Sequence, residues 1–173
     1  MDALIAGKVQ NARGFLHMHS VPRGLVSHVD WAISAVCENQ VSLNWEPQPI
    51  EAGSMRASAT WVGSDGFASR LVSSLAKWSK IRMDITQQPT NSSKGERYSL
   101  TPTLGVYRAV IDEFGETNIP ESRIRAALKR SIEESEPAEV EIAFLLGDPW
   151  DEELEPFRRA QSDTSVRWLN RTG

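Results

Sequence analysis

The sequence contains one cysteine, Cys37, among its 173 residues. A single thiol permits neither an intrachain disulfide nor a cysteine-rich zinc site, so we expect a buried structural role for it. Basic residues are also in short supply: 19 Lys and Arg stand against 23 Asp and Glu, a formal net charge of −4. Because nucleic acids and anionic membranes are bound by clustered basic side chains, we expect neither as a partner.

Long hydrophobic runs are missing too. No window approaches a membrane span, and residues 1–13 lack the apolar stretch of a signal peptide. We therefore expect a cytoplasmic protein. The length and the hydrophobic content of 40% suit one well-buried domain. We predict a flexible N-terminal arm over residues 1–12 and a single domain over residues 13–173.

Diagnostic catalytic motifs are absent. There are three histidines and no His-Glu-x-x-His pattern, and Ser20 lacks the flanking glycines of a nucleophile elbow. The sequence therefore defines no reaction, and we expect no cofactor.

The stretch from Phe15 to Gly24 is the most informative one. Its alternation predicts a strand with two distinct sides: Leu16, Met18 and Ser20 on one, and Phe15, His17 and His19 on the other. Pro22 suits the first turn of a following helix, and Ser20 suits the cap before it. Trp31 lies on the flank of this predicted helix.

Residues 13–88 read as β-α-β-β-α-β, with strands near residues 15–20, 41–46, 55–62 and 81–87. This succession is typical of the ferredoxin-like split βαβ arrangement. We predict one antiparallel sheet in which these strands are ordered fourth, first, third, second. Helices then cover one face of that sheet.

Residues 97–173 predict a second half packed on the first, so the fold class is α+β. Strands are expected at residues 98–100 and 106–111, with a hairpin to a short return strand ending at Ile119. Helices are expected after Pro120, over residues 137–146, and in an acidic stretch that Pro156 ends. Residues 166–169 suit one more strand or a docked tail.

The second half has spare apolar side chains, and Trp31 needs a cover. We expect some of these side chains to pack on it: Trp150, Leu154, Phe157 and Trp168. In that case the substitution Trp31→Ala costs about 3 to 5 kcal/mol.

Four strings of the sequence resemble a known family: residues 19–23 (HSVPR), 28–32 (HVDWA), 150–158 (WDEELEPFR) and 166–169 (VRWL). The chain is similar to an actinobacterial family of uncharacterised proteins, catalogued as a domain of unknown function. The resemblance covers nearly the whole chain after the N-terminal arm. It implies a cytoplasmic actinobacterial protein and no activity, cofactor or catalytic residue.

Alternation assigns six polar side chains to the sheet face opposite the helices: His17, His19, Arg56, Ser58, Arg82 and Asp84. Such a face is left wet in many antiparallel sheets. Two imidazoles, two guanidinium groups and a carboxylate in the middle of a sheet nevertheless serve stability less well than β-branched residues do. We therefore treat this face as a candidate ligand site, with His19 and Arg82 as its principal residues.

A second candidate is the junction between the first strand and its helix. Free N–H groups of Ser20 and its neighbours, with the helix dipole, favour a carboxylate or phosphate there, and Arg23 reinforces them. The alternative is that Arg23 pairs with an acidic side chain of the C-terminal half.

Three further readings are weaker. His17 and His19 point the same way and Asp84 supplies a third ligand, but no other metal-binding residue supports a metal site. His19 beside Ser20 suggests base and nucleophile, but adjacent strand residues project to opposite faces. RNA binding on this fold needs aromatic side chains where the third strand has Arg56 and Ser58.

We expect a non-enzymatic binding or regulatory module for a small anionic ligand or a partner protein. The alternative is a small hydrolase or transferase that uses His19 as base, with Arg23 or Arg82 as the anion clamp. A homodimer is compatible with both.

Overall fold

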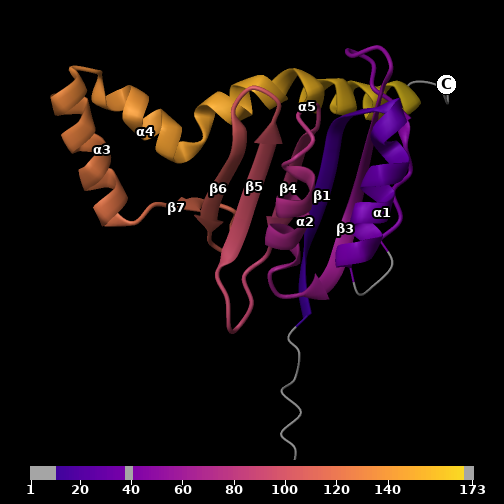
Figure 1. Ribbon diagram of the computed structural model, residues 1–173, viewed down its shortest axis with the longest axis horizontal. Coiled ribbons are helices and arrows are strands. Elements are labelled where there is room, and N and C mark those ends of the chain that lie inside the picture. The colour runs from indigo at the N-terminus through magenta and orange to yellow at the C-terminus, as the bar shows by residue number, and fades with distance from the viewer. Residues whose placement is uncertain (1–10, 38–40, 170–173) are drawn as a thin grey trace, which may run out of the picture.

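The computed structural model describes residues 11–37 and 41–169, with side chains described as far as Ala160. Over these residues the fold is α+β, an open seven-stranded antiparallel sheet with five α-helices (Figure 1). None of the helices in this part of the chain is long and apolar enough to cross a membrane.

The strands are β1 (Asn11–Pro22), β2 (Glu46–Pro47), β3 (Ser54–Ser64), β4 (Arg82–Gln87), β5 (Gly95–Thr101), β6 (Gly105–Ile111) and β7 (Thr117–Asn118). The helices are α1 (Val26–Val36), α2 (Phe67–Leu75), α3 (Glu121–Glu134), α4 (Ala138–Leu146) and α5 (Asp148–Leu169), and the short 3-10 helix η1 (Arg23–Leu25) precedes α1. The strand order is β2-β3-β1-β4-β5-β6-β7.

The predicted order of the first four strands is confirmed, because β4, β1, β3 and β2 are neighbours in that succession and every pair is antiparallel. The sheet does not stop at β4, however. Strand β4 also pairs with β5, which joins the two halves of the chain into one sheet. The ferredoxin-like assignment of residues 13–88 stays a prediction.

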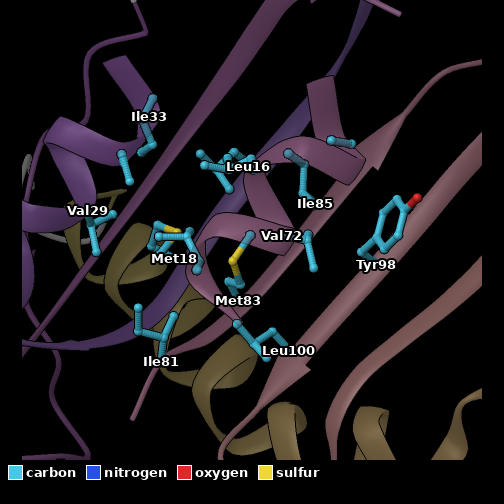
Figure 2. Close-up of a cluster of buried hydrophobic side chains, with 14 of the residues drawn as sticks. Leu16, Met18, Val29, Ile33, Val72, Ile81, Met83, Ile85, Tyr98 and Leu100 are labelled. Atoms are coloured by element: carbon cyan, nitrogen blue, oxygen red, sulfur yellow. The ribbon is translucent and has the colours of Figure 1, made fainter. Parts of the chain in front are cut away.

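The hydrophobic core lies between the sheet and helices α1 and α2. Figure 2 shows Leu16 and Met18 of β1 and Met83 and Ile85 of β4 facing Val29, Ile33 and Val72 of the two helices. These strand residues alternate with the polar ones, as the sequence predicts. Alternation therefore sends the other set of side chains to the opposite face of the sheet.

Strand β1 can sit between β3 and β4 because Gly14 has no side chain. A Cβ on Gly14 would lie 1.7 Å from the Thr86 carbonyl oxygen and 3.0 Å from the Trp61 ring. The Trp61 indole N–H donates to that same carbonyl at 3.2 Å, and its ring packs against Phe67 at 4.6 Å. The close approach and the indole together close the core at this end of the sheet.

The strand predicted over residues 41–46 is wrong in extent, since β2 consists of Glu46 and Pro47 alone. Val41, Leu43 and Trp45 are half-buried against the core instead. The Trp45 indole N–H donates to Asp30 of α1 at 3.0 Å. Side-chain packing against the core therefore replaces ladder pairing, although the alternating pattern is the same.

The C-terminal helices begin as predicted, and α4 also ends as predicted, whereas α5 does not. Gly147 closes α4 with φ of 90°, and a Cβ there would lie 2.6 Å from the Tyr107 ring. The chain then turns back into α5, which runs across the strands near one end of the sheet (Figure 1).

Pro156 does not end α5, which continues to Leu169 and takes in the residues predicted as a strand or tail. An internal proline costs about 3 kcal/mol because it removes a hydrogen bond and crowds the preceding turn. Leu154 before it is fully buried, and Phe157 and Arg158 after it contact the sheet. Packing on both sides of Pro156 outweighs the local cost.

The expectation for Trp31 is also wrong. Its side chain is 72% exposed, and its neighbour His28 packs edge-on against Trp78 at 6.3 Å. Three of the predicted residues lie on the other face of the sheet, where Trp150 packs on Tyr107, Leu154 is buried and Phe157 contacts Arg82. The fourth, Trp168, lies outside the residues whose side chains are described. A helix on one face cannot cover a residue of α1 on the other.

The two tryptophans Trp31 and Trp61 provide a matched test. Trp31→Ala should change the free energy of unfolding by less than about 0.5 kcal/mol, as for other exposed positions. Trp61→Ala should cost about 3 to 5 kcal/mol, because it empties a core site. Urea unfolding followed by far-UV circular dichroism measures both. Equal losses would contradict the burial described above.

Candidate functional site

The polar face of the sheet is covered by α5. Asp84 of β4, Ser99 of β5 and Tyr107 of β6 lie side by side in register on this face. Arg158 of α5 pairs with Asp84, and Trp150 of α5 packs on Tyr107 with ring centroids 5.2 Å apart. The face that the sequence marks as a candidate site is therefore the seat of the chain's own C-terminal helix.

A β-bulge in β1 changes which residues share this face. The register shifts between Met18 and Ser20 against β4, so that Ser20 stands opposite Arg82. His19 and Ser20 consequently both serve the polar face: His19 bonds Asp84, and the Ser20 hydroxyl donates to Glu51. The predicted helix cap at Ser20 is wrong, because no side chain caps η1 or α1.

The Asp84 carboxylate is the centre of the contacts with α5. It is 8% exposed and accepts hydrogen bonds from His19 Nε2 at 2.8 Å and from the Ser99 hydroxyl at 2.6 Å. Arg158 of α5 donates to the same carboxylate through Nε at 3.0 Å and Nη2 at 2.6 Å. Asp84 therefore connects three strands and a helix.

Two more guanidinium groups of the sheet hold carboxylates of α5. Arg97 of β5 pairs with Asp151, which also accepts from Arg158 at 2.7 Å. Arg82 of β4 pairs with Glu51 at 3.1 Å and with Glu153 at 3.5 Å, and it lies over the Phe157 ring at 4.7 Å. We call this group the α5 network: His19, Glu51, Arg82, Asp84, Arg97, Asp151, Glu153 and Arg158.

Arg56 and His17 lie beside the α5 network. Arg56 is 7% exposed, donates to the Ala160 carbonyl of α5 at 2.9 Å and pairs with Glu46 at 3.5 Å. The His17 ring stacks on His19 with centroids 6.0 Å apart, and its Nδ1 is 3.1 Å from the Ser58 hydroxyl. The predicted set on this face is thus brought together in full.

The electrostatics favour ionised carboxylates here. Burial alone raises the pKa of Asp84, but the hydrogen bond from His19 and the positive charges of His19 and Arg158 hold it well below its usual range. Burial likewise opposes ionisation of Glu51, yet the Ser20 hydroxyl and Arg82 lower its pKa. Burial, together with the neighbouring His19, lowers the pKa of His17.

Arg23 is the one predicted site residue that stands apart from this face. Its side chain is exposed in η1, and its backbone N–H donates to the Gly53 carbonyl at 2.9 Å. Within the part of the chain that the structure describes, no hydrogen bond or ion pair joins the Arg23 side chain to the α5 network. The acidic side chains Glu153 and Asp151 of α5 pair with Arg82 and Arg97 instead.

Sequence reasoning missed the partners from α5 and β5. A helix continued past Pro156 puts Asp151, Leu154 and Arg158 on one face, since they are three and four residues apart. Ending the helix at Pro156 hid that spacing. Arg97 and Ser99 are two residues apart on β5, so both side chains project to the polar face. This placement of Arg97 becomes visible in the sequence once β5 is taken to begin at Gly95.

A buried nitrogen of His19 remains unused. In the described residues Nδ1 of His19 has no hydrogen-bond partner, although the side chain is only 3% exposed. With Nε2–H donating to Asp84, the neutral form of the ring would carry its lone pair on Nδ1. Among residues 11–37 and 41–160, whose side chains are described, no group of three or more His, Cys, Asp or Glu is arranged to hold a metal.

A separate cleft of about 520 Å³ opens on the other face, where Asp65, Gly66, Gln87, Lys94, Glu96 and Arg108 line it. Its polar groups bond to one another: Gln87 donates to Asp65 at 2.5 Å, and Arg108 pairs with Glu96. The cleft thus contains charges of both signs and favours no single class of ligand.

A comparison with protein families bears on these residues. A family model described as a protein of unknown function, DUF3145, matches residues 15–171. The chain belongs to this family. No curated protein and no solved structure matches it. The match to DUF3145 contains every residue of the α5 network and assigns no role to any of them.

Removing the charge of Asp84 tests whether the α5 network stabilises the fold. Asp84→Asn should cost about 3 to 5 kcal/mol at pH 7, because His19 and Arg158 then lose their buried partner. The folded pKa of Asp84 is lowered, so its contribution is present above the unfolded value of about 4 and lost as the pH falls below that value. The gap between the urea midpoints of wild type and variant should therefore narrow from pH 5 to pH 3.

Ser99→Ala is the matched control, since it removes a hydrogen bond to Asp84 and leaves the charge. It should cost about 1 kcal/mol at all of these pH values. If the urea midpoints of the wild type and of Asp84→Asn fall in parallel from pH 5 to pH 3, protonation of Asp84 does not contribute to the pH dependence of stability.

Proposed function

We propose that this protein is a non-enzymatic binding or regulatory module whose polar sheet face recognises carboxylate or phosphate groups, and that α5 occupies this face in the absence of a ligand. The observation that carries the proposal is the pairing of Arg82 and Arg97 with Glu153 and Asp151 of α5. The carboxylates of Glu153 and Asp151 occupy the positions in which the anionic groups of a ligand would bind. A small anion or an acidic segment of a partner protein would take their place.

The charge balance supports competition rather than simultaneous binding. Arg56, Arg82, Arg97 and Arg158 each pair with a carboxylate, and those carboxylates come from Glu46, Glu51, Asp84, Asp151 and Glu153. An additional anion would meet no unpaired guanidinium in this group. A guanidinium group becomes available to the anion only when a carboxylate of α5 moves away from it.

Glu153 and its neighbour Glu152 make the decisive pair of variants. Glu153→Gln in the full chain releases Arg82 from one carboxylate and should tighten anion binding about fivefold to tenfold, since a partly buried pair is worth about 1 kcal/mol. Glu152 is exposed on the same helix, so Glu152→Gln should leave the affinity unchanged. Isothermal titration with inorganic phosphate, and with a synthetic peptide of residues 148–158, measures the binding.

Arg82→Gln should abolish binding of whichever probe binds, while circular dichroism reports that the fold survives. Amide exchange of α5 should rise when the probe is bound, because the helix is displaced. Equal affinities in the Glu152 and Glu153 variants, or undiminished binding by Arg82→Gln, would rule the proposal out. Phosphate binding without peptide binding would indicate a small anion as the ligand.

One observation favours the second candidate, a small hydrolase or transferase. Asp84 orients the His19 ring, and Nδ1 of His19 is free to accept a proton, which is the arrangement of a general base. Arg82 on the same face would hold the anion, whereas Arg23 lies apart from the α5 network. A hydrolysis rate on ester or phosphoester substrates that falls at least about a hundredfold in His19→Gln would support this candidate.

A further inference from the structure

Replacement of the whole of α5 on the polar face requires an occupant with charges of both signs. Arg82 and Arg97 hold carboxylates of α5, whereas Asp84 holds the guanidinium group of Arg158. Asp84 is 8% exposed, and loss of Arg158 would remove two hydrogen bonds from this carboxylate. Removing a charged partner of a buried carboxylate is costly. A simple anion can replace one carboxylate of α5, but it does not supply this cation.

The polar face also accommodates large apolar side chains. Trp150 packs on the Tyr107 ring, Leu154 is fully buried, and the guanidinium group of Arg82 lies over Phe157. Trp150, Leu154 and Phe157 are spaced by four and three residues, so they share one side of a helix. Anchors with this spacing are typical of an amphipathic helix that binds a complementary surface. The face therefore fits a helix better than an extended segment.

A second copy of this chain carries a helix that meets all of these requirements. The groups that α5 presents to the sheet follow one another in the order Trp150, Asp151, Glu153, Leu154, Phe157 and Arg158. The three charged side chains of this series pair with Arg97, Arg82 and Asp84 in turn. Every copy has the same face and the same helix, so the charge complementarity between them is the same within one chain and between two chains.

Helix α5 is joined to the sheet by a two-helix arm, which consists of α3 and α4. The arm leaves the sheet after β7 and lies beyond its edge (Figure 1). Of the fourteen residues of α3 only Ala127 is fully buried, and of the nine residues of α4 only Leu145 is. The Tyr107 hydroxyl, which donates to the Leu145 carbonyl at 2.9 Å, links the end of α4 to β6. Little apolar burial therefore opposes a movement of the arm about Ile119 and Pro120, between β7 and α3.

We propose that two copies of this chain exchange their arms, so that the α5 of each copy lies on the polar face of the other. The exchange keeps the pairs of the α5 network and makes each pair between sheet and helix an intermolecular one. Because both copies give and receive the same helix, the dimer is closed by a two-fold axis. The inference rests on the proposed function in one respect, since α5 leaves its own sheet in both.

The monomer should predominate at micromolar concentrations. In the wild type, exchange competes with the return of α5 to its own sheet, and a short tether gives that site an effective concentration on the order of millimolar. The exchanged dimer holds the same contacts, so it should become the main species only as the protein concentration approaches this value. Weakening the pairs within one chain should therefore reveal exchange at lower concentrations.

Complementary charge reversals test the exchange in the full chain. Arg97→Asp places a like charge opposite Asp151, and Asp151→Arg places one opposite Arg97. Each variant alone should remain monomeric, because exchange between identical copies does not relieve the repulsion. In an equimolar mixture, exchange pairs the new arginine of one variant with the new aspartate of the other and restores the original pair on the second face.

The mixture should therefore form a heterodimer. Its dissociation constant should be at least about tenfold lower than that for self-association of either variant, since two opposite-charge pairs replace two like-charge ones. Native mass spectrometry identifies the heterodimer by its mass, and sedimentation equilibrium measures its dissociation constant.

The controls separate exchange from a general effect of charge. Glu152 is exposed on α5, so a mixture of Glu152→Arg with Arg97→Asp should form no heterodimer. A single chain with both Arg97→Asp and Asp151→Arg regains its own pair and should stay monomeric at micromolar concentrations. Circular dichroism reports whether each variant folds. Arg82→Glu with Glu153→Arg is a second pair of the same design, for use where a variant of the first pair does not fold.

A mixture of folded variants that forms no heterodimer would overturn the exchange, and so would a Glu152→Arg mixture that forms one equally well. The proposed function fails separately, if neither inorganic phosphate nor the peptide of residues 148–158 binds in the titrations. Binding of either probe without heterodimer formation would remove the exchange alone.

Discussion

The buried carboxylate of Asp84 is the constraint on which the polar half of this structure depends. An ionised carboxylate at this depth is expensive to desolvate, and it is tolerated only with several donors around it. His19, Ser99 and Arg158 provide them from β1, β5 and α5. Three segments distant in the sequence must therefore meet at one pair of oxygen atoms, and the position of α5 on the sheet follows from this requirement.

The same requirement explains the shape of β1. A regular strand would send Ser20 to the apolar side, together with Leu16 and Met18. The bulge after Met18 instead lets His19 reach Asp84 while Ser20 reaches Glu51, which also receives Arg82. One extra residue in the strand thus gives two polar side chains on one face, which is a typical use of a bulge.

Period-two alternation made the sheet face predictable from the sequence. His17, Arg56, Arg82 and Asp84 were assigned to one side by that rule alone, and the structure puts them there. The bulge at Ser20 was not predictable, because it leaves no pattern in a single sequence. The strand at residues 41–46 failed for a different reason: its alternation is satisfied by packing Val41, Leu43 and Trp45 against the hydrophobic core.

Local rules failed where tertiary packing opposed them. Proline is a reliable helix breaker in isolation, but Leu154 and Arg158 on either side of Pro156 hold α5 to the sheet. Trp31 shows the reverse error. Its size suggested burial, yet the apolar residues meant to cover it belong to a helix on the opposite face. The contacts that hold α5 to the polar face join residues far apart in the sequence, such as Asp84 and Arg158, and composition does not reveal that pairing.

Occupation of the polar face by α5 has a thermodynamic consequence for any ligand that binds there. If the face is free in a fraction f of molecules, the apparent dissociation constant is the intrinsic one divided by f. If α5 is docked in about 99% of molecules, the apparent dissociation constant of an anion is thus about a hundredfold higher than the intrinsic one. Because linkage is reciprocal, a ligand that binds the open face also releases α5 by the same factor. Under this proposal the ion pairs of Asp151, Glu153 and Arg158 would set the affinity of the face for such a ligand without contacting it.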